Sequence, residues 1–339
     1  MASLQTSLCR ALKIDIPIVQ APIGPATNPA MTAAVSNAGG LGMLAFLRRD
    51  ADDVRRLISE THELTDRPFG ANFILRGLEE TDDRLEACLE SGVGVVSFHW
   101  DEPYEYIERI HSADTLVMYT VGSAEDARRA VGAGVDIIVA QGWESGGHVR
   151  GEVATMALLP KVVDAVTPVP VISAGGIADG RGMAAALMLG ADGVWVGTRF
   201  VASVEASVDP SYKERILKAS EADTLLSKVF NGGWDATGRA LRNSTTGNWE
   251  AAGCPEIGQR PGEGEVIARG SDGEPVERYS AIGPYTGVTG DLEGLSNWAG
   301  QSAGMVDRIQ PAAEIVREIA EGAVAVLRGA SALVQDQPD

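Results

Sequence analysis

Short apolar segments recur along the first 200 residues of the chain, and each of them ends at or near a glycine or a proline. They occupy eight stretches, namely 18–23, 41–45, 69–75, 93–100, 116–121, 137–141, 169–174 and 194–200. Several, such as DIIVA and PVPVISA, do not alternate between apolar and polar residues, which is typical of parallel strands covered on both faces. The pattern therefore predicts eight parallel strands.

Amphipathic stretches lie between these segments and predict helices, for example at 50–60, 82–90, 123–131, 156–166 and 179–189. Ser123 and Asp179 open two of them, and these side chains are favourable at a helix N-terminus. Eight strand–helix units favour a (β/α)8 TIM barrel. A doubly wound open sheet is the alternative, but no GxGxxG motif follows the first strand.

This alternation stops after Phe200. Residues 205–305 contain half of the six tryptophans (Trp234, Trp249 and Trp298) and an acidic, glycine-rich stretch at 258–275. We interpret 205–305 as a cap or insertion over the barrel mouth, with a mobile surface loop inside it. A plain C-terminal extension is the alternative.

The barrel then comprises residues 1–204 and 306–339. Its last part, PAAEIVREIAEGAVAVLRG, has the apolar spacing of a helix that packs on the barrel exterior, and Pro311 suits the first turn of that helix.

Charge and cysteine content exclude several classes of function. The chain has 28 Lys+Arg and 47 Asp+Glu, a net charge of −19, which argues against binding to nucleic acid or to an anionic membrane. Its three cysteines form no CxxC pair, so neither a disulfide framework nor a cysteine zinc site is expected, and no metal-ligand pattern is visible. No apolar run is long enough for a signal peptide or a membrane span, so we expect a cytoplasmic protein.

Two predicted strand ends carry glycines suited to an anion. Gly175 and Gly176 follow the seventh strand, and Gly197 and Thr198 follow the eighth. Glycine lets backbone N–H groups approach a ligand closely, and the loops after strands seven and eight are the recurring phosphate site of TIM barrels. No Lys or Arg precedes Arg181 or Arg199 in these loops. We therefore expect a phosphate held mainly by backbone donors.

The loop after the sixth strand holds the main candidate for catalysis. It contains Gln141, Glu144, His148 and Arg150 among four glycines. A neutral imidazole can abstract a proton near pH 7, so His148 is the natural general base. Of the other histidines, His62 and His111 are expected to be solvated at helix ends, and His99 ends the fourth strand, where it either lines the barrel mouth or packs.

The segments QAPIG, GANF, AQGWESGGH, ISAGGI, GVWVGTRF and WAGQSAG, in this order, resemble the nitronate monooxygenase family, formerly called 2-nitropropane dioxygenases. The resemblance extends from about residue 10 to residue 325 and implies a TIM barrel that holds FMN non-covalently. At the position where the family often has Met after Ala-Pro, this chain has Ile23, and the glycine-rich acidic stretch has no clear counterpart.

The resemblance also implies site residues. Pro22 and Ile23 would make backbone contacts near the flavin ring, Asn72 and Gln141 would hydrogen-bond the ring or ribityl chain, and Gly146 would approach it closely. The phosphate would be held by Gly175, Gly176, Gly197 and Thr198, with Trp195 and Val196 lining the approach. His148 matches the family's catalytic histidine.

The reaction implied by the resemblance is oxidation of an alkyl nitronate, or of a nitroalkane deprotonated by His148, by O2 to a carbonyl compound and nitrite. An FMN-dependent NAD(P)H reductase acting on an enoyl thioester (ACP or CoA) or a quinone is the alternative, since the motifs resemble those enzymes too. A non-catalytic flavin- or phosphate-binding protein is a third reading, against which His148 in so glycine-rich a loop argues. The expected partners are a small-molecule substrate and O2, and a homo-oligomer is compatible with the sequence.

Overall fold

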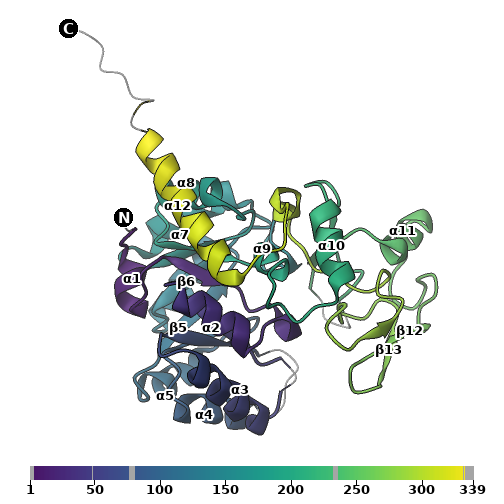
Figure 1. Cartoon of the computed structure of the whole chain (residues 1–339), viewed down its shortest axis with the longest axis horizontal. Coiled ribbons are helices and arrows are strands. Elements are labelled where there is room, and N and C mark those ends of the chain that lie inside the picture. Colours follow the sequence, from purple (N-terminus) through teal and green to yellow (C-terminus); the bar gives the residue numbers. More distant parts are fainter. Residues whose placement is uncertain (1–3, 48, 76–80, 232–235, 331, 333–339) are drawn as a thin grey trace.

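A computed structural model describes residues 4–47, 49–75, 81–231, 236–330 and 332 of the 339-residue chain. Figure 1 shows a barrel built from the first part of the chain and the long C-terminal helix, with a smaller unit from the green part of the chain beside it. Within the described residues, no helix combines the length and apolar character needed to cross a membrane. The three cysteines are not in disulfides.

Eight parallel strands form one sheet in the order β1-β9-β8-β6-β5-β4-β3-β2. They are β1 (Ile18–Gln20), β2 (Gly42–Ala45), β3 (Phe69–Ile74), β4 (Val95–His99), β5 (Leu116–Val121), β6 (Ile137–Gln141), β8 (Val171–Ala174) and β9 (Gly193–Val196). The edge strands meet, because the Gln20 N–H donates to the Leu41 carbonyl and the Leu41 N–H to the Ile18 carbonyl, both at 2.9 Å. The sheet thus closes into the predicted barrel, and the open doubly wound sheet is excluded.

Helices cover the outside of this barrel. They are α2 (Pro29–Asn37), α3 (Ala51–Leu64), α4 (Thr81–Glu90), α5 (Ile107–His111), α6 (Ala124–Gly132), α7 (Thr155–Val166), α8 (Gly180–Met188), the short α9 (Thr198–Val201) and α12 (Ala312–Ala330). The Ser123 and Asp179 side chains accept backbone N–H groups at the starts of α6 and α8, as the sequence predicts. The apolar run 194–200 is shorter as a strand than expected, because the chain leaves β9 at Gly197 and begins α9.

The barrel interior is closed at the N-terminal ends of its strands. Side chains that point inward, such as Val19, Met43 and Ile172, pack against helix α1 (Ser7–Leu12) in one buried cluster. A Cβ added to Gly193 would lie only 2.4 Å from Leu8 Cδ2, so α1 packs in direct contact with the N-terminal ends of the strands. A binding site is therefore confined to the other end, where the strands finish and TIM barrels carry their sites.

The smaller unit contains two three-stranded sheets and two helices. One sheet has the order β10-β11-β7 and the other β13-β12-β14. Their elements are β7 (Gly147–His148), α10 (Pro210–Lys218), β10 (Thr224–Ser227), β11 (Gly238–Leu241), α11 (Ser244–Ala251), β12 (Val266–Arg269), β13 (Pro275–Glu277) and β14 (Thr289–Gly290). The glycine-rich stretch 258–275 consists of exposed turns on either side of β12, and β12 pairs with β13. Trp234 lies outside the described residues.

Three short 3-10 helices complete the described structure, η1 (Gly24–Ala26), η2 (Tyr104–Tyr106) and η3 (Gln301–Met305). Helix α12 packs on α8 at close range, since a Cβ on Gly180 would lie 2.3 Å from the backbone nitrogen of Ala323. The C-terminal helix therefore lies against the barrel exterior (Figure 1).

Candidate active site

A cavity of about 260 Å³ lies at the C-terminal ends of the barrel strands. Eleven of the twelve residues named above as the predicted site line it: Pro22, Ile23, Asn72, Gln141, Gly146, His148, Gly175, Gly176, Trp195, Gly197 and Thr198. Val196 does not, because successive side chains of a strand point to opposite faces. Trp195 faces the barrel interior, whereas Val196 is fully buried against the surrounding helices.

The sequence did not single out the residues that close the cavity from the side of the smaller unit. These are Asn231, Ala281, Tyr285, Trp298, Gly300 and Ser302. Three of them belong to the WAGQSAG segment, which is the one sequence signal that could have placed this part of the chain at the site. The barrel contributes further apolar and polar lining from Leu47, Ile74, His99, Thr120 and Ile177.

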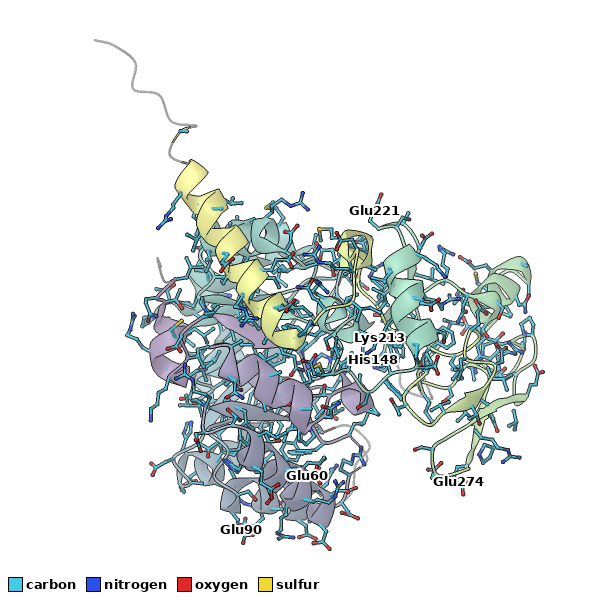
Figure 2. The ribbon with its side chains drawn as sticks, viewed as in Figure 1. Glu60, Glu90, His148, Lys213, Glu221 and Glu274 are labelled. Carbon is cyan, nitrogen blue, oxygen red and sulfur yellow. The ribbon has the colours of Figure 1, made fainter. Side chains whose placement is uncertain are left out.

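His148 lies where the barrel meets the smaller unit (Figure 2). Its backbone forms β7 and pairs with Gly238 of β11. The Gln141 side chain holds the same loop from the barrel side: its Nε2 donates to the His148 carbonyl at 3.1 Å, and its Oε1 accepts the Arg150 N–H at 2.9 Å. The Gln141 amide therefore fixes the backbone on both sides of Val149 and, with it, the position of His148.

Aromatic rings surround the His148 imidazole. The Trp298 ring centre lies 5.0 Å from that of His148, and the Trp100 ring centre lies 6.4 Å away. Burial lowers the pKa of His148 to about 4. Burial, helped by the nearby His148 and Arg150, lowers the pKa of His99 to about 3. Both imidazoles are therefore neutral at pH 7, and both line the cavity.

The two predicted glycine turns meet at one wall of the cavity. Gly175 and Gly176 have φ of +108° and +75°, a backbone conformation that favours glycine. Within the described residues, the backbone N–H groups of Gly176 and Gly197 make no intramolecular hydrogen bond. None of the described lining residues is a lysine or an arginine. A wall of free backbone donors without basic side chains fits a phosphate-bearing cofactor.

Gly146 and Thr198 make contacts with the smaller unit that the sequence did not predict. A Cβ added to Gly146 would lie 2.5 Å from the Gly300 nitrogen, so this glycine is needed for the crossing of two backbone segments. The Thr198 hydroxyl accepts the Gly300 N–H at 2.9 Å. Both residues thus join the barrel to the 298–304 segment.

Glu144 and Arg150 flank His148 in sequence but do not line the cavity. The Glu144 carboxylate accepts the N–H of Thr155 and caps helix α7. The Arg150 guanidinium lies 5.0 Å above the ring centre of Tyr119 and 3.7 Å from the Asp126 carboxylate. The side chains of Glu144 and Arg150 therefore stabilise the fold around the site and do not line the cavity.

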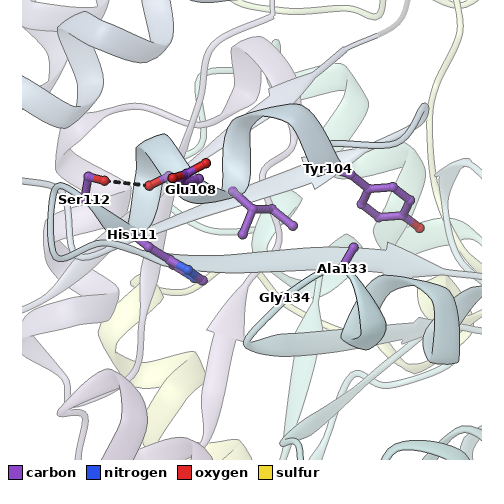
Figure 3. Close-up of a pocket in the computed structure, with 7 residues that line it drawn as sticks. Tyr104, Glu108, His111, Ser112, Ala133 and Gly134 are labelled. Carbon is purple, nitrogen blue, oxygen red and sulfur yellow. Dashed lines mark hydrogen bonds between the residues drawn. The ribbon is translucent and has the colours of Figure 1, made fainter.

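A second hollow, of about 540 Å³, lies on the outer surface near α5 and α6 (Figure 3). It is lined by Tyr104, Ile107, Glu108, His111, Ser112, Ala133 and Gly134. His111 is partly exposed there and is hydrogen-bonded to Asp136 at 2.8 Å. None of the predicted site residues faces this hollow.

The chain matches the family described as nitronate monooxygenase over residues 5–322. The chain belongs to the nitronate monooxygenase family. It is therefore a flavin-dependent oxidoreductase that acts on small molecules.

Several members of this family and its structural relatives are similar to the chain over nearly their whole length. A methyl-oxo-octahydro-indene carboxyl-CoA dehydrogenase of Mycobacterium tuberculosis is 33% identical over 98% of this chain and 99% of its own. FabK from Thermotoga maritima superposes with a TM-score of 0.81 at 36% identity, covering 97% of this chain and 99% of its own. Nitroalkane oxidase from Streptomyces ansochromogenes has a TM-score of 0.75 at 30% identity, covering 96% and 99%.

Proposed function

We propose that the protein is an FMN-dependent nitronate monooxygenase, which oxidises alkyl nitronates with O2 to a carbonyl compound and nitrite. The observation that carries the proposal is the convergence of the neutral His148 imidazole and the free glycine N–H groups on one cavity. The family match and the likeness to a nitroalkane oxidase support it.

The residues that would hold FMN are those of the predicted site. The N–H groups of the Gly175–Gly176 and Gly197–Thr198 turns would bind the phosphate. The Asn72 amide, held by two hydrogen bonds to Ser97, and the Gln141 amide would bind the ring or ribityl chain. When bound, FMN supplies the electron acceptor that couples oxidation of the substrate to reduction of O2.

His148 would act on the proton at the carbon beside the nitro group. Its imidazole is in the proton-accepting form at pH 7, but a pKa of about 4 makes it a weak base. A nitronate has already lost this proton, and its negative charge next to the ring would raise the pKa of His148. We therefore expect nitronates to react faster than neutral nitroalkanes. The apolar side chains of Ile23, Ile74 and Ile177 line the cavity and would contact the alkyl group of the substrate.

The decisive experiment compares two reductants. The purified protein should be yellow and should release FMN on denaturation. Anaerobic enzyme is mixed separately with an alkyl nitronate and with NADH, and the flavin absorbance is followed. Bleaching by the nitronate, with nitrite formed once O2 is admitted, is the expected result. Bleaching by NADH alone, with no response to nitronates of different chain length, would overturn the proposal.

A reductase of an acyl thioester is the second candidate. It is favoured by the likeness to the enoyl reductase FabK, at 36% identity. The carboxyl-CoA dehydrogenase of Mycobacterium tuberculosis, which aligns over 98% of this chain, supports a CoA thioester as the substrate, although its name denotes the oxidative direction. In that reaction NAD(P)H would be the hydride donor, and the neutral His148 would orient the substrate carbonyl. The NADH arm of the same experiment, repeated with an enoyl-CoA or a quinone as acceptor, tests it.

We further propose that residues 205–305 act as the cap that selects the substrate, and that residues 1–204 and 306–339 form the cofactor-binding barrel. The support is that six cavity-lining residues, from Asn231 to Ser302, come from this segment.

A further inference from the structure

Thr155, the first residue of helix α7, lies between the two loops that build the site. Its hydroxyl is 3.0 Å from Glu144 Oε2, in the loop that carries His148, and 3.2 Å from the carbonyl oxygen of Gly175, in the predicted phosphate turn. Neither Thr155 nor Glu144 lines the cavity. Thr155 thus contacts the back of the phosphate turn, away from any ligand.

The surroundings leave the hydroxyl proton available to Gly175. The backbone N–H of Thr155 already bonds both carboxylate oxygens of Glu144, at 3.1 and 3.0 Å. The carboxylate therefore keeps a donor when the hydroxyl turns its single proton to Gly175. The Gly175 carbonyl, in contrast, accepts only the Thr155 hydroxyl among the hydrogen bonds of the described residues.

Two glycines make room for this contact. A Cβ on Gly142 would lie 2.0 Å from Thr155 Oγ1 and 2.6 Å from Glu144 Oε2. A Cβ on Gly175 would lie 3.0 Å from the same hydroxyl oxygen. Two crowded positions around one hydroxyl group indicate that its location is tightly defined by packing.

The direction of one peptide follows from this hydrogen bond. In a trans peptide the C=O and the next N–H point in opposite directions. Because Thr155 holds the Gly175 carbonyl on its side, the N–H of Gly176 points away from Thr155. Gly176 lines the cavity, and within the described residues its N–H makes no hydrogen bond.

We propose that Thr155 is a positioning residue for the cofactor phosphate. Glu144 holds Thr155 through its backbone N–H, and the Thr155 hydroxyl locks the Gly175–Gly176 peptide so that the Gly176 N–H is presented to the phosphate. This inference rests on the proposed function, because it assumes that this turn binds a phosphate-bearing flavin. It gives a residue outside the cavity, at the start of α7, a part in cofactor binding. It also assigns Glu144 a role in cofactor binding through Thr155 in place of contact with the substrate.

The test compares FMN with riboflavin, which has the same ring and ribityl chain but no phosphate. Both are titrated into flavin-stripped protein, and the dissociation constants are measured from quenching of flavin fluorescence. Thr155→Val removes the hydroxyl at nearly constant volume, and Thr155→Ser retains it. Thr167→Val is the matched control, because Thr167 directly follows the last residue of the same helix and, among the described residues, its hydroxyl donates only to the Val163 carbonyl. Circular dichroism and melting temperature report whether each variant is folded.

We expect Thr155→Val to weaken FMN binding about tenfold, the effect of one misdirected hydrogen bond to a charged group, and to leave riboflavin binding unchanged. Thr155→Ser and Thr167→Val should keep the wild-type ratio of the two affinities. If Thr155→Val is folded and keeps the wild-type ratio, or weakens both flavins equally, the inference is overturned. If Thr155→Val does not fold, Thr155→Ala, which cannot overpack the site, is titrated in its place under the same criterion.

A different result would identify failure of the proposed cofactor site itself. Wild-type protein that binds FMN and riboflavin equally has no phosphate site in this turn. That outcome overturns both the site and the inference, whereas an unchanged ratio in Thr155→Val overturns only the inference. The 31P resonance of bound FMN is an independent readout, because it should shift in Thr155→Val and stay at its wild-type position in Thr167→Val.

Discussion

The barrel and the unit formed by residues 205–305 are built by different rules. Each barrel strand pairs with neighbours at a regular register, and several of the following helices begin at a local signal such as Ser123 or Asp179. In the smaller unit the strands are two to four residues long and belong to two separate sheets. Its elements are joined by contacts between residues distant in sequence, such as those from the Asn243 side chain to the Glu293 and Leu295 carbonyls.

This difference divides the site into two halves. The barrel supplies fixed backbone donors at the ends of β8 and β9, which suit a cofactor that many related enzymes share. The smaller unit supplies side chains, including Tyr285 and Trp298, which close the cavity over the reacting centre. Cofactor binding should therefore depend on the barrel, and substrate choice on the unit that covers it. His148 is where the two halves meet, since β7 pairs with β11.

The largest expected effect is that of His148→Ala. If the barrel alone holds the cofactor, this variant should keep its FMN content and much of its nitronate activity. Turnover of neutral nitroalkanes should fall by a factor of roughly 100 or more, because the remaining imidazole of the cavity, His99, has a pKa of about 3 and is a still weaker base. O2 consumption with each substrate and the absorbance of bound flavin are the measurements.

His111→Ala is the control for this variant, since His111 lies in the outer hollow and pairs with Asp136. It should leave both activities unchanged. Loss of FMN from His148→Ala would show that the loop at the junction holds the cofactor, and the division into two halves would then fail.

The same division explains how much could be predicted from the sequence. The eight strands, their order and the glycine turns at Gly175 and Gly197 follow from local signals: apolar runs, helix caps and glycine placement. Local signals could not predict why residue 146 must be a glycine. A side chain there would collide with the backbone of Gly300, which lies more than 150 positions further along the chain. Nor could they show that Val196 faces outward, because this depends on which strand face closes the barrel.

A second expectation concerns acid stability. The folded-state pKa values of His148 and His99, about 4 and about 3, lie below the 6.5 of an exposed histidine. Between these values the unfolded chain binds more protons than the folded chain, so the free energy of unfolding rises with pH. It should fall as the pH drops below about 6.5, by on the order of 3 kcal/mol for His148 once the pH is below about 4.

Urea unfolding at pH 7, 6, 5 and 4 measures this loss. Carboxylates also contribute over this range, so the comparison is with His148→Gln, which cannot titrate. The variant should show a shallower fall than the wild type between pH 6.5 and pH 4. Parallel curves would mean that the imidazole is not buried at the junction, and the smaller unit would then not cover the site as described.

Gly146→Ala tests the contact between the two halves directly. The added methyl group would meet the Gly300 nitrogen at 2.5 Å, so one backbone segment must move. We expect a loss of about 1–3 kcal/mol in the free energy of unfolding, typical of overpacking. Gly247→Ala is the matched control, because Gly247 lies inside α11 with no atom within 4 Å of an added Cβ, and alanine there should be neutral or stabilising by up to about 1 kcal/mol.

If Gly146→Ala and Gly247→Ala have the same melting temperature, the backbones of residues 146 and 300 are not packed together. The two halves of the site would then be joined only by the other contacts described, such as the Thr198–Gly300 hydrogen bond and the pairing of β7 with β11.

The smallest effects should come from the caps of two helices, one in each region. Ser123 caps α6 through a single bond, to the Asp126 N–H. Asn243 caps α11 in the same way, but its Nδ2 also donates to the Glu293 and Leu295 carbonyls at 2.9 and 2.8 Å. We expect Ser123→Ala to lower the free energy of unfolding by about 1 kcal/mol. Asn243→Ala should cost about 1 kcal/mol more, because the two hydrogen bonds to the distant 293–295 segment are lost together with the cap.

Equal losses for the two substitutions would contradict the contrast between the regions, since a cap in the barrel serves one helix, whereas a cap in the smaller unit also holds a distant segment. Asn243→Asp separates the two functions of Asn243. The carboxylate still accepts the Thr246 N–H and keeps the cap, but it cannot donate to Glu293 or Leu295. If the long-range bonds are what stabilise this region, Asn243→Asp should be nearly as unstable as Asn243→Ala, and the corresponding Ser123→Asp should retain the stability of the wild type.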